Sequence, residues 1–417
     1  MKNVLVLSFA VSPYRGTEYA VGWNFIVNMS KVNKLFVLYA HEICKNDIEH
    51  FLSKEQLENV EFFYCGTNKN KRKNVNILVD FYSFYQESKK LHKRALKIAE
   101  QLVRERSIDC VHYLNPIGFK EPGYLWMLNK PYVWGPVQGV ANWPIACCRI
   151  LSFRGWFEYL CRMLFHNLQL YLNLRVRRAF LRADVVVAAT KDSKRQIDRV
   201  FKIKSLFRPE NALLRVEAST PIFFEKGERL RLFFAGTLND RKGLMLFLCA
   251  LAGFVRKRHV ELHVCGDGPL LNSLKKFCLR KHLDDIVIWY GNQPREYVQN
   301  LFRTMHLLII PSLSEATTTV LFEAMSKGVP ILSLNHCGMG SVLNEDVAFL
   351  IKIGSFYQIV NDITNSLNLI LDEPAIIERK SKAMLDLAPK YLWDNQISFF
   401  EFCYNCAIKA FRTKENV

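Results

Sequence analysis

The chain has 417 residues, half of them hydrophobic, so it exceeds one typical domain core and predicts two domains. Lysine and arginine exceed aspartate and glutamate by 57 − 39 = 18, and residues 1–225 hold 34 of the basic and 20 of the acidic residues. This basic first half leaves nucleic acid, an anionic membrane face and phosphorylated ligands as candidate partners. No apolar run approaches the ~18 residues of a membrane-spanning helix, so no such helix is expected.

The first residues, MKNVLVLSFAVSP, combine one lysine with a short apolar run, as a signal peptide does. A glycine-containing turn and an amphipathic segment follow at once, so we interpret this run as a first buried strand. Twelve cysteines are scattered along the chain, and the Cys403/Cys406 pair lacks a second pair at metal-binding spacing. Such cysteines are typical of packing thiols in a reducing compartment. The expected location is the cytoplasm, with peripheral contact to the inner face of the cell membrane as an option.

Short apolar runs alternate with longer amphipathic stretches, which predicts parallel sheets covered by helices on both faces. Six candidate strands precede a break near residues 215–229, and six follow it, so we expect an α/β fold with two doubly wound domains, 1–220 and 221–393. Ligands of such sheets bind at the carboxyl ends of the strands. The candidate strands are residues 3–9, 35–40, 60–65, 109–114, 131–135, 184–189, 230–236, 259–266, 286–291, 306–312, 329–334 and 347–352, and the clearest helical stretches are 242–258 and 269–282.

Two segments depart from this pattern. Residues 67–76, TNKNKRKNVN, are basic and polar and are expected to form a solvated loop. Residues 149–182 form a long, aromatic, helix-like stretch with seven arginines and one acid, Glu158. A basic amphipathic helix of this kind suits an anionic headgroup interface. The alternative is a long helix packed on its own domain with its arginines in water, and the residues do not decide between the two.

The stretch LLIIPSLSEATTTVLFEAMSKGVPIL, residues 307–332, ends a strand and begins a helix at its threonines. Free backbone N–H groups at a helix start bind phosphate. Glu315 lies in the turn, and Glu323 lies about two turns into the helix. Carboxylates beside a phosphate site are suited to accept hydrogen bonds from sugar hydroxyls, which indicates a nucleotide-sugar site. The alternative is that Glu315 only caps the helix and Glu323 is solvated.

Two further turns have a comparable strand–turn–helix pattern. In FFAGTLNDRKGLMLFLCAL, Gly236 ends a strand, and Arg241 and Lys242 stand at the next helix start. Two cations there can grip a diphosphate leaving group, although an ordinary basic helix start would look the same. In LHVCGDGPLLNSL, Gly266 and Gly268 form a second glycine-rich turn, which is a weak signal alone.

The motifs GTLNDRKG, HVCGDGP, PSLSE and FEAMSKGVPIL, in this order and with two glutamates eight residues apart, resemble the GT-B fold retaining glycosyltransferases of family 4. These group 1 enzymes include a bacterial surface-polysaccharide type. The resemblance covers most of residues 230–352, and it extends more loosely to SPYRGTEYAVGW, DCVHYLNP, PYVWGPVQG and RPENALL in the first half. It implies two facing Rossmann-like domains with a deep cleft between them, and a C-terminal helix, residues 394–417, that crosses back to the first domain.

The resemblance also implies roles for the residues of the donor site. Lys242 would bind the donor diphosphate, and Gly236 and Gly266 would lie in the same donor site. Glu323 would hold the ribose hydroxyls, and Glu315 would face the donor hexose as a catalytic residue.

Other implied contacts come from the backbone and from the first domain. The amides near Thr318 and Thr319 would bind the distal phosphate. Gly16 would approach the donor phosphate or the acceptor from the other domain. Enzymes of this kind need no metal, and no metal or other cofactor is expected here.

The chain departs from the family pattern at Gln138, where a glycine is usual, and at two places that bear on catalysis. Thr237 stands where the family commonly has an arginine, and Arg241 is expected to supply that charge from the next turn. His112 matches the first histidine of an acceptor-side His-x-His pair, but Leu114 occupies the second place. A catalytic role for His112 is therefore an expectation on half of the motif.

The resulting expectation is a hexosyltransferase that acts on a saccharide acceptor, often lipid-linked, in the synthesis of capsule, lipopolysaccharide or a similar polysaccharide. Residues 149–182 would contact an anionic membrane surface, and no nucleic-acid partner is expected. Two alternatives stay open: a nucleotide-sugar epimerase on the same fold, and a nucleic-acid-binding protein suggested by the net charge.

Overall fold

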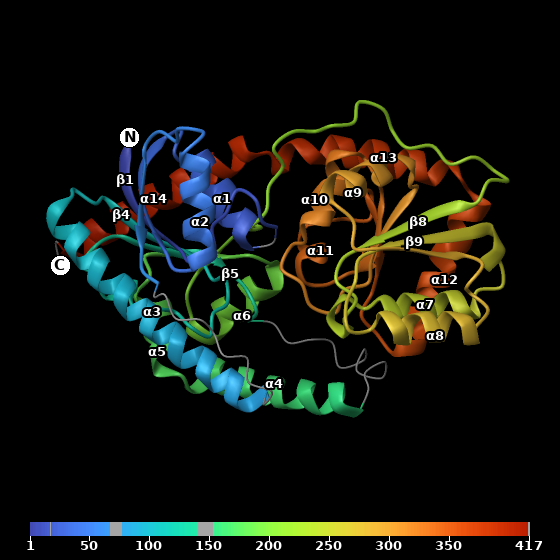
Figure 1. Cartoon of the computed structure of the whole chain (residues 1–417), viewed down its shortest axis with the longest axis horizontal. Coiled ribbons are helices and arrows are strands. Elements are labelled where there is room, and N and C mark those ends of the chain that lie inside the picture. The colour runs from blue at the N-terminus through green and yellow to red at the C-terminus, as the bar shows by residue number, and fades with distance from the viewer. Residues whose placement is uncertain (17, 67–76, 141–152, 416–417) are drawn as a thin grey trace. The chain divides into compact units, whose positions relative to one another are not determined.

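The computed structural model describes residues 1–16, 18–66, 77–140 and 153–415 (Figure 1). Two parallel sheets form its framework, and helices cover both faces of each sheet, which confirms the predicted α/β fold (Figure 1). The chain divides into two compact units. Of the described residues, the first unit takes 1–140, 164–210 and 394–415, and the second takes 153–163 and 211–393. Among the described residues the chain thus passes between units at 163/164, 210/211 and 393/394, whereas the sequence predicted boundaries only at 220/221 and 393/394.

The sheet of the first unit has the strand order β3-β2-β1-β4-β5-β6-β7, with all neighbours parallel. Its central strands are buried on both faces, which explains why they are nearly continuous apolar runs. The strands are β1 (Lys2–Ser8), β2 (Asn33–Tyr39), β3 (Val60–Tyr64), β4 (Cys110–Asn115), β5 (Tyr132–Val137), β6 (Val185–Ala188) and β7 (Leu206–Phe207). The helices of this part are α1 (Glu18–Met29), α2 (Glu42–Leu52), α3 (Ile77–Glu105), α5 (Leu174–Arg182), α6 (Lys191–Phe201) and the C-terminal α14 (Trp393–Glu415). Helix α4 (Phe153–Leu172) begins in the second unit and enters the first at residue 164.

The sheet of the second unit has the order β10-β9-β8-β11-β12-β13, again all parallel. The chain order reverses between β8 and β11, so the loops after these two strands meet at the switch point where ligands of such sheets bind. The strands are β8 (Leu230–Ala235), β9 (Val260–Cys265), β10 (Val287–Gly291), β11 (Leu307–Ile310), β12 (Ile331–Leu334) and β13 (Ala348–Ile351). The helices are α7 (Leu244–Gly253), α8 (Leu271–Arg280), α9 (Arg295–Leu301), α10 (Thr319–Ser326), α11 (Cys337–Val342), α12 (Phe356–Asp372) and α13 (Ala375–Leu387).

All twelve predicted strands are present within two residues of their predicted ends, and α7 and α8 lie within the two predicted helical stretches. The short edge strand β7 was not predicted, because two residues carry no readable pattern. The predicted loop 67–76 and residues 149–152 of the basic segment lie outside the described residues. In the part of the chain that the structure describes, no helix has both the length and the hydropathy needed to span a membrane.

The C-terminal helix α14 packs against the first unit. Its Glu401 accepts hydrogen bonds from Lys2 Nζ and Asn33 Nδ2, both at 2.6 Å, on the first two strands. Its Phe400 ring lies edge-on to Phe25 of α1 at 5.0 Å between centroids. The last residues of the chain therefore help to complete the unit that the first residues begin.

Candidate active site

The turn after β8 fixes the position of Lys242. The Asn239 side chain caps a short 3₁₀-helix, Asp240–Lys242, by accepting a hydrogen bond from the Lys242 backbone N–H at 3.1 Å. Gly243 then adopts a φ of +67°, and a Cβ atom there would lie 2.1 Å from the Pro311 carbonyl oxygen. The turn after β8 is thus pressed against the loop after β11, and only glycine fits at this contact.

Two cations from the turn after β8 contact one carboxylate from the loop after β11. Glu315 Oε2 lies 2.8 Å from Arg241 Nη1 and 2.9 Å from Lys242 Nζ. The side chains of Glu315 and Lys242 are only 12% and 13% exposed, whereas that of Arg241 is 41% exposed. Arg241 also donates to the Ser314 carbonyl oxygen at 3.1 Å. The cluster has two positive charges and one negative charge, so it retains a net attraction for an anion.

Gly236 and Gly266 form the floor beside this cluster. A Cβ atom on Gly236 would lie 3.6 Å from Lys242 Cε, so the lysine stem passes over this glycine. Gly266 has a φ of +140°, and its Cβ would lie 2.0 Å from the Gly236 carbonyl oxygen. The two predicted glycine turns therefore lie against each other at the ends of neighbouring strands, and the contact excludes a side chain on Gly266.

The loop after β11 leads into α10 with its threonines largely buried. Thr317 and Thr318 are 4% and 8% exposed, and Thr318 is the N-cap residue of α10. Within the described residues, its side chain makes no capping hydrogen bond to the first turn. Thr319 is the first helical residue, so the predicted phosphate-binding amides lie at this helix start.

Glu323 lies on α10 with its side chain 16% exposed. Burial raises the pKa of its carboxyl group, and the nearby positive charges of Arg295 and Lys327 partly offset this effect. Arg295 Nη2 lies 3.3 Å from Glu323 Oε1. Lys327 is itself paired with Glu217 at 2.8 Å. Glu323 is thus neither fully solvated nor buried in an apolar core.

Arg295 is a site residue that the sequence reasoning missed. It begins α9, directly after Pro294, and its side chain is 81% exposed even though it pairs with Glu323. The run QPRE does signal a helix start, because proline favours that position. Nothing in the sequence, however, joins a helix after β10 to a glutamate on α10.

The structure places the predicted residues of the first unit as follows. Gly16 lies exposed in the loop after β1, and a Cβ atom there would meet no atom of the described chain within 4 Å. Next to it, Arg15 pairs with Asp47 at 2.6 Å, and Ser12 donates to the same carboxylate. The role of Gly16 toward a ligand stays a prediction.

The structure gives His112, for which a catalytic role was predicted, internal packing and hydrogen bonds instead. His112 is fully buried in the middle of β4, and its Nε2–H donates to the Gly135 carbonyl oxygen at 2.6 Å. Its Nδ1 accepts from the Tyr404 hydroxyl of α14 at 2.9 Å. Both ring nitrogens are therefore used inside the protein, and neither can exchange a proton with a substrate.

The buried His112 predicts a dependence of stability on pH. Burial lowers the pKa of His112 from its ordinary value of 6.5 to about 4. Between these values only the unfolded chain binds a proton at this residue, so the free energy of unfolding should fall by about 1.4 kcal/mol for each pH unit below 6.5. Above pH 6.5 this contribution is complete.

Urea unfolding at a series of pH values tests this expectation in the wild type and in His112→Gln. Between pH 6.5 and 4 the free energy of unfolding should fall more steeply with decreasing pH in the wild type than in the variant. The difference between the two slopes should correspond to about one bound proton. Equal slopes would show that His112 does not carry the effect. The comparison uses the difference between slopes because other buried groups titrate in both proteins.

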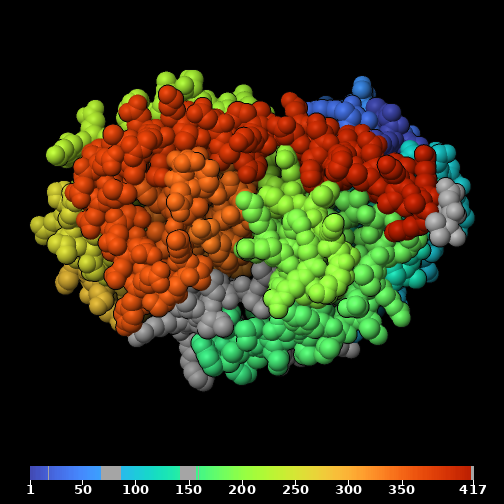
Figure 2. Space-filling view, turned by 180° about the vertical axis from the view of Figure 1, so that it is seen from behind, coloured from blue at the N-terminus to red at the C-terminus, as the bar shows by residue number. Residues whose placement is uncertain are grey.

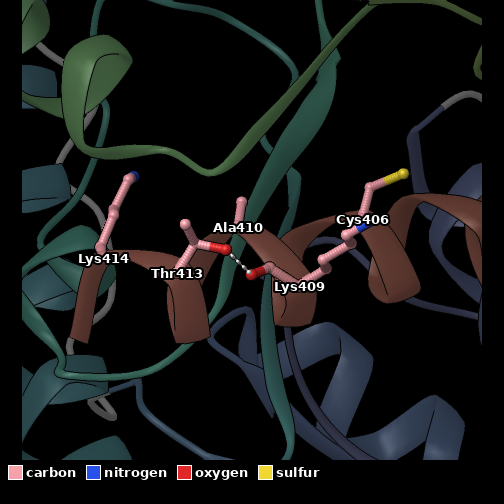
Figure 3. Close-up of a pocket in the computed structure, with 5 residues that line it drawn as sticks. All are labelled: Cys406, Lys409, Ala410, Thr413 and Lys414. Carbon is pink, nitrogen blue, oxygen red and sulfur yellow. Dashed lines mark hydrogen bonds between the residues drawn. The ribbon is translucent and has the colours of Figure 1, made fainter. Parts of the chain in front are cut away.

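Two shallow depressions in the described surface have no predicted site residue in their walls. One follows the outer face of α14 and is lined by Cys406, Lys409, Ala410, Thr413 and Lys414 (Figure 3). Thr413 Oγ1 donates to the Lys409 carbonyl oxygen there, so its hydroxyl serves its own helix (Figure 3). The other depression is lined by side chains of α8.

Comparison with known proteins matches most of the second unit to a protein family. Residues 217–383 match the family of glycosyl transferases, group 1. The chain is 25% identical over 166 residues to an α-D-kanosaminyltransferase of Streptomyces kanamyceticus, which covers 39% of this chain and 42% of that protein. It is 32% identical over 94 residues to a lipopolysaccharide 1,6-galactosyltransferase of Escherichia coli K12, which covers 22% and 26%. The matches thus span about two fifths or less of these relatives.

The fold extends the similarity to the whole chain. The apo structure of the lipopolysaccharide outer core galactosyltransferase WaaB has a TM-score of 0.65, with 16% identity over 99% of this chain and all of that one. A structure of Anabaena HepE in complex with UDP has a TM-score of 0.60, with 15% identity over 97% of this chain and all of that one. These likenesses show the GT-B fold.

Proposed function

We propose that this chain, whose residues 217–383 match the family of glycosyl transferases, group 1, moves a hexose from a nucleotide-sugar to a hydroxyl of a saccharide. The observation that carries the proposal is the convergence of Arg241 and Lys242 on Glu315 at the switch point of the second sheet. A pair of cations held there suits a diphosphate, and a carboxylate suits sugar hydroxyls.

In the proposed reaction, the donor diphosphate binds to Lys242 and Arg241 in place of Glu315. Glu315 is then released to accept hydrogen bonds from the hexose, while Glu323 accepts them from the ribose. The bond between the sugar C1 and the diphosphate oxygen breaks, and both cations stabilise the charge that develops on that oxygen. The acceptor oxygen bonds to C1 from the same face, and its proton passes to the departing diphosphate.

The acceptor and the biological context belong to the same proposal. Proteins named as lipopolysaccharide galactosyltransferases occur among the similar proteins, which supports a saccharide acceptor in a cell-surface polysaccharide. We propose a lipid-linked acceptor, because such polysaccharides are extended at a membrane. A UDP-hexose is the first donor to test, because one similar structure contains UDP with glucose.

In the proposed chemistry, Lys242 and Arg241 stabilise the charge on the leaving group, and a metal ion has no role. Two fixed cations in a mostly buried cluster can neutralise a diphosphate in the way that a divalent ion does in other transferases. Activity is accordingly expected to persist in excess EDTA. Loss of activity in EDTA that Mg²⁺ or Mn²⁺ restores would contradict this assignment.

The test of the function uses water as the acceptor. The protein is incubated with UDP-glucose or UDP-galactose in deuterated buffer, and proton NMR follows the released sugar before mutarotation equilibrates its anomers. We expect release of UDP together with the α-anomer of the sugar, which is the retained configuration. The β-anomer would show inversion. A new UDP-sugar isomer without free UDP would instead identify an epimerase.

A further inference from the structure

The helices α4 and α5 expose a row of apolar side chains. Phe157 and Leu164 are 62% and 65% exposed, and Leu168 and Leu172 are 47% and 69% exposed. Their spacings of seven, four and four residues put them on one face of α4. Cys161 and Tyr171 lie on the same face and are also exposed. The green side chains of this region lie at the surface in Figure 2.

This apolar row is not the face by which the helices pack. Leu170 of α4 is 2% exposed, and Val176 and Phe180 of α5 are fully buried in the core of the first unit. His166 points inward and hydrogen-bonds the Val140 carbonyl oxygen at 2.9 Å. Each helix therefore has a buried face already, and the exposed row forms a second apolar face that the described chain leaves uncovered.

Three exposed arginines lie on α4 and α5, whose sequences contain one acidic residue, Glu158 of α4. Arg162 of α4 and Arg177 and Arg178 of α5 are exposed, and none of them pairs with a described carboxylate. Arg175, in contrast, turns inward and pairs with Glu121. Within the described residues these arginines have no carboxylate partner, and their side chains are exposed.

We propose that this face of α4 and α5 docks on an anionic lipid membrane, with the helix axis of α4 parallel to the surface. The 20 residues of α4 extend about 30 Å, and their apolar row can enter the boundary between headgroups and acyl chains. The unpaired arginines then meet lipid phosphates. A second copy of this chain is a poorer occupant, because it would bring unpaired arginines against one another.

Docking is a property separate from the proposed transfer reaction, since it needs no catalytic residue. It would also locate that reaction at the membrane, because docking would bring the protein to a lipid-linked acceptor. The sequence left membrane contact and ordinary packing of residues 149–182 as equal alternatives. The exposure of the apolar row favours membrane contact.

Co-sedimentation with vesicles tests the proposal in the full-length protein. The wild type is expected to bind vesicles of phosphatidylglycerol and phosphatidylcholine, and to bind pure phosphatidylcholine much more weakly. The triple variant R162Q/R177Q/R178Q should bind the mixed vesicles about 100-fold more weakly. The control R258Q/R280Q/R303Q removes three exposed arginines from the second unit, with the same change in net charge, and should bind like the wild type.

A second pair of variants tests the apolar row. L164E/L168E should lose vesicle binding, whereas L279E/L369E should keep it. Leu279 and Leu369 are 65% and 44% exposed on other helices, so the control matches the variant in exposure and in charge. Circular dichroism melting of each variant checks that it is folded.

Two results would overturn the proposal. One is the absence of vesicle binding by the wild type, and the other is an equal loss of binding in the variants and their controls. A lipid-free dimer that L164E/L168E dissociates, found by analytical ultracentrifugation without vesicle binding, would assign this face to a second copy instead. Because UDP release in solution needs no vesicles, failure of docking is distinguishable from failure of the transferase function.

Discussion

Replacing Lys242 by methionine is expected to lower kcat for sugar transfer by about 100- to 1,000-fold. Lys242 Nζ is held 2.9 Å from Glu315 in a mostly buried position, so its charge is already oriented when the leaving group departs. Methionine keeps the apolar stem that passes over Gly236 but removes the charge. The variant should therefore stabilise the transition state less, because the diphosphate oxygen gains charge there. This effect should appear in kcat.

Steady-state kinetics with a UDP-hexose measures this effect. Lys276→Met is the matched control, because Lys276 is an exposed lysine on α8 in the same unit, and it should leave kcat unchanged. Arg241→Met should have a smaller effect than Lys242→Met, since Arg241 is 41% exposed and water screens its charge. A Lys242→Met protein that keeps its kcat and only raises KM would contradict the proposed role.

Replacing Glu323 by alanine is expected to weaken nucleotide binding by about 100-fold or more, because each hydrogen bond to a charged group contributes about 1.5–3 kcal/mol. The carboxylate is mostly buried, and Arg295 and Lys327 lie near it, so its position is fixed before a ribose arrives. Glu323→Gln keeps the shape and one acceptor oxygen and should lose less affinity than Glu323→Ala.

Calorimetric titration of the nucleotide measures these affinities. Glu378→Ala removes an exposed glutamate from α13 in the same unit and serves as the control. If Glu323→Ala and Glu378→Ala both bind nucleotide as tightly as the wild type, Glu323 does not contact the ribose. An equal loss in both would instead point to a general electrostatic effect.

The strands could be predicted because buried parallel strands must be apolar along their whole length. For the same reason the site was largely predictable: the carboxyl ends of parallel strands meet at one edge, so the turn at Lys242 and the loop at Glu315 had to come together. The sequence also located Gly236 and Gly266. It could not show that Glu315 Oε2 holds both cations, because side-chain contacts depend on the packing of the two loops.

His112 shows where the sequence reasoning failed. The expectation rested on half of an acceptor-side His-x-His pair, but α14 returns to cover that strand and supplies Tyr404 from 292 residues away. No local pattern reports such a contact. Arg295 was missed for the same reason, since its pairing with Glu323 joins two helices that follow different strands. The apolar row on α4 likewise required a structure, because periodicity alone cannot tell a buried face from an exposed one.

The most direct test of the donor site is a thermal-shift panel of UDP-, GDP- and ADP-sugars and the free nucleotides on the wild type and Glu323→Ala. A ligand that binds only the folded state raises the melting temperature by mass action. We predict that one nucleotide family stabilises the wild type and that Glu323→Ala loses most of this stabilisation. The absence of any shift in the wild type at saturating nucleotide would contradict the existence of a nucleotide-sugar site.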